Sequence, residues 1–151
     1  MTRIALTALA AAALAAAAVP AAADAHRPEA ASFARVATVQ LTLAGGGHAG
    51  TMTLAGAGRT TAVRFAVSGL PARARADARV YAGTRPAAAR TRVAALPRVA
   101  ADARGRASGT GYATAGGGQL PVEAVADGAH IVVLASGGRV LAWGRIPRAE
   151  G

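Results

Sequence analysis

The chain has 151 residues, of which 17 are basic and 7 are acidic, giving a formal net charge of +10 at pH 7. It contains no cysteine, which excludes a disulfide and a lipid-modified cysteine. Every basic residue is an arginine. The excess positive charge predicts attraction to anionic surfaces. The number of large apolar side chains suffices for one modest core, so we expect a single domain.

The first 25 residues predict a cleavable export signal. Arg3 precedes residues 4–19, an apolar stretch that is nearly all alanine and leucine. Small residues follow, and cleavage after Ala23 and cleavage after Ala25 are both open. The apolar stretch is shorter than the roughly 20 residues that span a bilayer. We therefore expect an exported protein, periplasmic or extracellular, with no membrane span after cleavage.

Alternating polar and apolar residues dominate the chain after a flexible arm expected at 26–35. Glycine, proline and Asp-Gly turns separate these patterns, and no window carries a helical stripe. The composition therefore predicts an all-β sandwich or barrel of seven to eight short strands over residues 36–148. The strand patterns occupy residues 38–43, 51–55, 61–68, 76–82, 106–114, 131–135 and 140–146.

Several segments are expected to lie outside strands. Residues 73–106 hold nine arginines against two aspartates and few large apolar residues, so much of this segment is expected to be solvated loop. Glycine triplets at 45–47 and 116–118 predict hairpin loops. Glu123 lies in an apolar stretch and is expected at a strand edge, facing water.

Two stretches resemble sequence signatures of the copper/zinc superoxide dismutases and of the related CHRD-type exported domains. Residues 67–71 with 78–84 resemble a Gly-Leu turn and the strand whose His-x-His pair binds copper in that family. Residues 136–146 resemble its closing Gly-Gly-x-Arg segment, and 131–135 resemble the strand with a further copper histidine. The resemblance implies a superoxide dismutase-like fold with Greek-key antiparallel strands.

The same resemblance implies that the metal site is degenerate. Arg79 and Tyr81 stand where the paired copper histidines are expected, and Leu134 stands at the later one. A guanidinium offers no lone pair to a metal. Trp143 replaces the closing cysteine and Arg85 lies near its partner, so we expect Trp143 to be buried in place of the bridge. We therefore expect no cofactor and no dismutase activity.

Three histidines leave other functions open. His48 and His130 are expected in exposed loops. His26 would be the third or the first residue of the mature chain, where the terminal amine and the imidazole suit copper. A periplasmic copper binder that uses His26 is therefore one alternative. An active or metal-binding dismutase that uses other residues is the second.

Arginine placement predicts an anion-binding role. Arg73, Arg75 and Arg79 share the parity of one strand face, and the others follow in loops that the family places around its metal channel. We expect an anionic surface or a small anion as the partner of a binding or structural protein. Nucleic acid is not expected, because Tyr81 is the only aromatic residue in this stretch. The candidate residues are Arg73, Arg75, Arg79, Arg85, Arg90 and Arg92.

Overall fold

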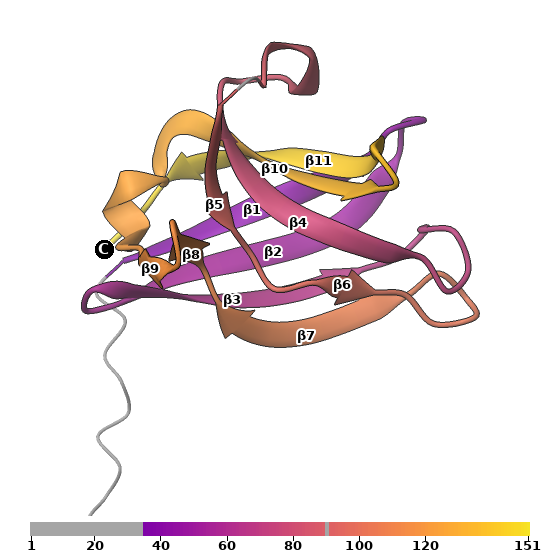
Figure 1. The fold of residues 1–151 in the computed structure, drawn as a ribbon, viewed down its shortest axis with the longest axis horizontal. Helices are drawn as coiled ribbons and strands as arrows, with labels where there is room; N and C mark the ends of the chain where they lie inside the picture. Colours follow the sequence, from indigo (N-terminus) through magenta and orange to yellow (C-terminus); the bar gives the residue numbers. More distant parts are fainter. Residues whose placement is uncertain (1–34, 90) are drawn as a thin grey trace, which may run out of the picture.

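The computed structural model describes residues 35–89 and 91–151, which form β-strands joined by turns and two 3₁₀ helices, η1 (Pro86–Ala88) and η2 (Val122–Ala124) (Figure 1). In these residues, no helix is both long and apolar enough to cross a membrane. The strands are β1 (Val36–Leu43), β2 (His48–Ala57), β3 (Thr60–Val67), β4 (Arg75–Ala82), β5 (Arg92–Ala95), β6 (Val99–Ala100), β7 (Ala107–Tyr112), β8 (Thr114–Ala115), β9 (Gly118–Gln119), β10 (Asp127–Ser136) and β11 (Arg139–Arg148).

The strands form one antiparallel sheet that curls around a single core. Their order is β7-β3-β2-β1-β11-β10-β4-β5-β8-β9, and β6 pairs with β4. Pairing of the first strand with the last joins the β1–β3 half to the β10–β11 half. Curling brings β6 beside β7 (Figure 1), and Leu70 N donates to Gly105 O at 3.1 Å across the loops nearby. The predicted all-β architecture of antiparallel strands is confirmed.

Alternating side chains give the strands a buried inner face and a solvated outer face. β1 buries Val39 and Leu41, and β2 buries Met52 and Leu54. The residues between them on β1 and β2 are exposed or half-buried. This is the period of two that the sequence carries in its first three strands. On β1 and β2, one face thus belongs to the core and the other faces solvent.

The segment 73–106 contains more strand than the sequence predicts. β4, β5 and β6 all lie within it. The inner faces of β4 and β5 are built largely from alanine, namely the buried Ala76, Ala78 and Ala94, whereas β6 buries Val99. Small inward side chains give a weak hydrophobic signal, although they pack as tightly as larger ones. The predicted strand at 106–114 also divides, because Ala113 interrupts it between β7 and β8.

The chain before β10 is held by a buried hydroxyl. Thr61 is the fully buried polar residue of the described core, and its Oγ1 donates to Leu120 O at 2.7 Å. This bond fixes the segment that leads into η2. Glu123 lies within η2 rather than at a strand edge, and its Oε1 is 3.8 Å from Arg35 Nε, with both side chains about half exposed. An exposed pair of this kind stabilises little.

Gly144 allows β1 and β11 to approach closely. A Cβ built at Gly144 would overlap the Gln40 carbonyl oxygen and would lie 2.8 Å from Val39 Cγ1. Beside this contact, Thr42 pairs with Trp143, and Leu43 pairs with Ala142. A side chain at position 144 would separate the strands that join the two halves of the sheet.

Gly144→Ala is therefore expected to destabilise the fold by about 1 to 3 kcal/mol, the usual cost of overpacking. Chemical unfolding of the full chain measures the change. Gly45→Ala is the matched control, because a Cβ at Gly45 meets no atom within 4 Å. Equal unfolding midpoints for the two variants would contradict the close approach.

Candidate functional site

The outer face of β4 carries charged and aromatic side chains. Arg75, Asp77, Arg79 and Tyr81 alternate with the buried Ala76, Ala78 and Val80. Arg75 and Arg79 share this face, in agreement with the predicted parity. Arg73 lies before the strand, in a turn, with a φ of 58°. It therefore belongs to the loop and not to the strand face.

One carboxylate divides its charge between two arginines on this face. Arg79 Nη2 donates to Asp77 Oδ2 at 3.1 Å, and Arg98 Nε donates to Asp77 Oδ1 at 3.3 Å. The three side chains are 40 to 70% exposed, so solvent screens the attraction. The contacts orient the guanidinium groups and cancel one of their two charges.

A hollow of about 290 Å³ lies beside Arg79 and Tyr81. Strand pairing places Val133 opposite Arg79 and Ile131 opposite Tyr81, on the outer face of β10. Leu134 pairs with Ala78 and is fully buried on the opposite, inner face. The structure therefore brings Arg79 and Tyr81 together and separates Leu134 from them. The hollow is lined by Asp77, Arg79, Tyr81, Pro86, Ala89, Val133, Ala135, Gly137, Gly138 and Val140.

The donors on this face do not fit the copper that the fold family implies. Arg79 is cationic and has no free lone pair, Val133 has no donor atom, and the phenol of Tyr81 is a poor ligand. The described residues hold no group of three or more His, Cys, Asp or Glu side chains that could bind a metal. His26 lies outside the described residues.

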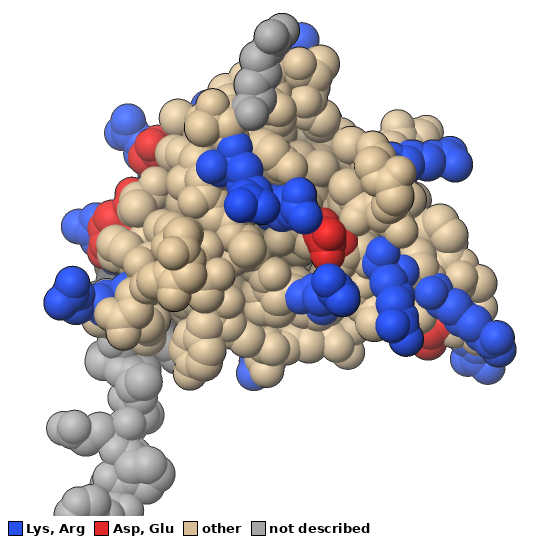
Figure 2. Space-filling view, in the orientation of Figure 1, with Lys and Arg blue, Asp and Glu red and all other residues tan. Residues whose placement is uncertain are grey.

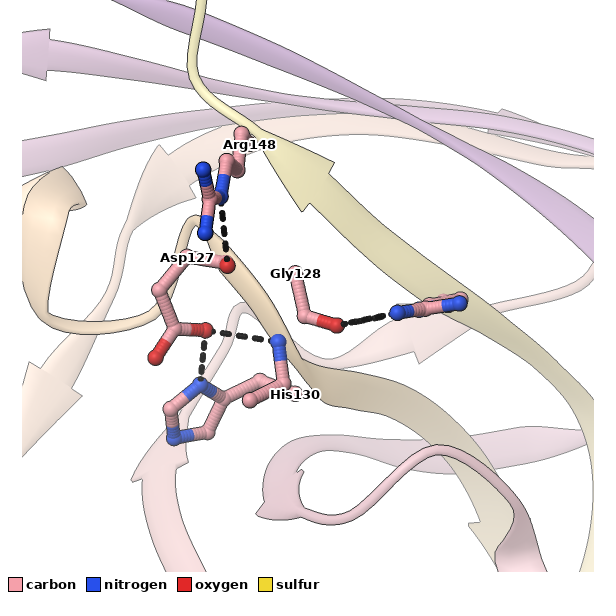
Figure 3. Close-up of polar contacts among 6 residues, drawn as sticks. Asp127, Gly128, His130 and Arg148 are labelled. Atoms are coloured by element: carbon pink, nitrogen blue, oxygen red, sulfur yellow. Dashed lines mark hydrogen bonds and ion pairs between the residues drawn. The ribbon is translucent and has the colours of Figure 1, made fainter.

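The two described histidines differ in their surroundings. His48 is exposed, but it begins β2 instead of lying in the glycine turn. His130 is only 13% exposed, and its Nδ1 lies 2.8 Å from Asp127 Oδ1 (Figure 3). The predicted exposed loop position for His130 is therefore wrong. Pairing with Ala82 and Ile146 directs His130 toward the inner side of β10.

Four exposed arginines gather where the β3–β4 and β6–β7 loops meet. Asp102 lies among them, but its Oδ1 accepts the backbone N–H groups of Arg104 at 2.7 Å and Arg106 at 2.9 Å. These two bonds, that of Arg106 first, hold the pKa of Asp102 below its usual value. Among residues 35–89 and 91–151, no ion pair involves these four side chains. We call Arg73, Arg75, Arg104 and Arg106 the basic end.

The remaining candidate arginines are spread along the same face. Arg85 is exposed before η1, and Arg92 pairs across the strand with Tyr81. Arg90 lies outside the described residues. Figure 2 shows basic side chains across the face over β4 to β6. More of them gather at the end of the molecule where the β3–β4 and β6–β7 loops of Figure 1 lie. The 73–106 arginines thus form a surface, not one compact site.

Trp143 does not fill the core. Ala142, Gly144 and Ile146 are the buried residues of β11, so Trp143 projects from the other face and is half-buried. Its strand neighbours there are Thr42 and Val133. The prediction that Trp143 is buried in place of a disulfide is wrong, because strand parity directs it outward.

The Asp127 carboxylate is expected to make the stability of the fold depend on pH in the acidic range. The N–H of Ala129, and after it the His130 side chain, hold its pKa below the ordinary 3.8. A lowered folded pKa adds stability above the unfolded pKa, which disappears as pH falls through the folded value. Asp127→Asn should therefore be less stable than the wild type at pH 7 and closer to it at pH 3. Urea unfolding at both pH values measures this, and a constant difference would contradict it.

Comparison with known proteins bears on the fold. No protein-family model matches the chain, and no curated protein shows significant similarity to it. Among solved structures, it resembles the crystal structure of a point mutant of an SOD-like protein from Bacillus subtilis, with a TM-score of 0.55 and 13% sequence identity. The match covers 73% of this chain and 97% of that chain. At this identity the likeness concerns the fold alone, and the chain folds as a superoxide dismutase-like domain.

Proposed function

We propose that this chain is an exported superoxide dismutase-like protein without dismutase activity, and that it binds acidic polysaccharide through its arginine surface. The observation that carries the proposal is the chemistry of the outer face of β4. Arg79 and Tyr81 occupy the strand where the sequence signature expects two copper histidines, and Val133 faces them from β10. Cationic and apolar side chains replace the neutral imidazoles that copper requires.

The basic end supplies the attraction for an anion. On β4, Asp77 compensates part of the charge of Arg79 and Arg98. At the basic end, the Asp102 carboxylate is committed to backbone N–H groups and fixes the loop. The four arginines of the basic end therefore keep their guanidinium donors free for carboxylate or sulfate groups. A guanidinium group binds such anions in bidentate fashion.

A repeating acidic polymer fits this arrangement better than nucleic acid does. The arginines extend from the basic end along β4 toward Arg92, which pairs with Tyr81, so successive acidic groups can contact successive side chains. Stacking of bases requires several aromatic rings, and Tyr81 is the only one between residues 73 and 106. Electrostatic contact of this kind weakens as salt rises.

Absence of dismutase activity is the first expectation. The full chain, loaded with copper and then dialysed against a chelator, should remove superoxide no faster than buffer, because Arg79, Tyr81 and Val133 offer copper no suitable donor set. A cytochrome c competition assay measures the rate. Activity that survives the chelator would overturn this part of the proposal.

Localised polysaccharide binding is the second expectation. Reversing Arg73, Arg104 and Arg106 to Glu should weaken binding to immobilised heparin, a model acidic polysaccharide, by at least tenfold at 0.15 M salt. The matched control reverses the exposed Arg59, Arg64 and Arg139, which changes the net charge equally. Affinity chromatography and titration compare the two proteins. Equal weakening in both variants would show an effect of net charge and refute a localised site.

A further inference from the structure

A second candidate binding site lies between β1 and β11, away from the basic end. The two strands pair at Thr42 with Trp143, and an isolated bridge joins Val36 to Glu150 just after β11. Between these points the described ladder has no β1–β11 pairs, and Pro147 has no N–H to offer there. A hollow of about 590 Å³ lies at this interruption. Its lining is Thr38, Gln40, Asp127, Gly128, Arg145, Pro147 and Arg148.

One end of the hollow is lined by a hydrogen-bonded turn at the start of β10. Asp127 Oδ1 accepts the N–H of Ala129 at 2.8 Å and lies 2.8 Å from His130 Nδ1. Gly128 has a φ of +86°, which other residues rarely adopt. Figure 3 shows how this turn presents the carbonyl groups of Asp127 and Gly128 toward β11.

These carbonyl groups hold two arginines in place. Arg145 donates through Nε at 2.9 Å and Nη2 at 2.8 Å to Gly128 O. Arg148 donates through Nε to Asp127 O at 3.3 Å. A carbonyl oxygen is neutral, so it orients a guanidinium without cancelling its charge. The Asp127 carboxylate, already bonded to Ala129 and His130, offsets only one of the two positive charges.

We propose that this hollow binds a small organic phosphate, such as a phosphorylated sugar. The carbonyl bonds leave the Nη1 atoms of both arginines and Nη2 of Arg148 without a partner among the described residues. Those donors suit the oxygens of a phosphate dianion. The Thr38 hydroxyl and the Gln40 amide, on the opposite wall, can bond the hydroxyl groups of a sugar. Because the arginines are already oriented, binding loses less side-chain entropy than at a free surface arginine.

The test compares charge-preserving substitutions on one strand. Glucose 6-phosphate is titrated calorimetrically into the full chain at 0.15 M salt, and inorganic phosphate and glucose are titrated separately. We expect saturable binding of glucose 6-phosphate, weaker binding of phosphate and none of glucose. Arg145→Lys keeps the charge but loses the forked contact to Gly128 O, and should weaken binding at least tenfold. Arg139→Lys, at the other end of β11 and outside the hollow, should bind as the wild type does.

Thr38→Val is a second test of the same hollow. Thr38 is exposed on the opposite wall and lies far from the Gly128 turn in sequence. The substitution should weaken the binding of glucose 6-phosphate several-fold and leave the binding of inorganic phosphate unchanged. This comparison still tests the proposal if a thermal melt shows that Arg145→Lys does not fold. Absence of saturable binding by the wild type would overturn the proposal. Equal affinities of Arg145→Lys and Arg139→Lys, or of Thr38→Val and the wild type, would also overturn it. The polysaccharide proposal, which depends on the basic end, stands or falls separately.

Discussion

The close approach of β1 to β11 is the contact on which the rest of the structure depends. It joins the β7-β3-β2-β1 half of the sheet to the half that begins with β11. Gly144 permits it, because any side chain there would meet the Gln40 carbonyl group. Contacts between the first and last strands are the most distant in sequence and therefore the most costly in chain entropy. Pairing of β11 with β10, and of β10 with β4, then fixes which residues of these strands lie on the outer face.

The arginines of this domain act differently according to what holds them. The Asp77 carboxylate contacts both Arg79 and Arg98, which orients the two side chains and cancels part of their charge. At the basic end, the Asp102 carboxylate is taken by backbone N–H groups, and no ion pair among the described residues involves the four arginines. At the Gly128 turn, the Gly128 carbonyl group orients Arg145 without cancelling its charge. The net charge of the chain does not distinguish these three arginine environments.

Local sequence patterns predicted much of the fold. The alternation at 38–43, 51–55 and 61–68 corresponds to β1, β2 and β3, and the glycine triplets lie at hairpin turns as expected. The pattern failed at β5, since the inner-face Ala94 looks the same as alanine in a loop, and at β6, which has only the two residues Val99 and Ala100. Alanine becomes a core residue only when a neighbouring strand covers it.

By itself, the sequence determined the strand period of the first hairpins, the positive charge and the absence of cysteine. These properties are local or compositional, so no partner strand is needed to recognise them. Tertiary structure decided which face each later residue occupies. Leu134 is buried, Val133 faces Arg79, and Trp143 points outward, because a shift of one residue in a strand reverses the face. The pairing of Arg145 with Gly128 likewise arises only when β11 folds back along β10.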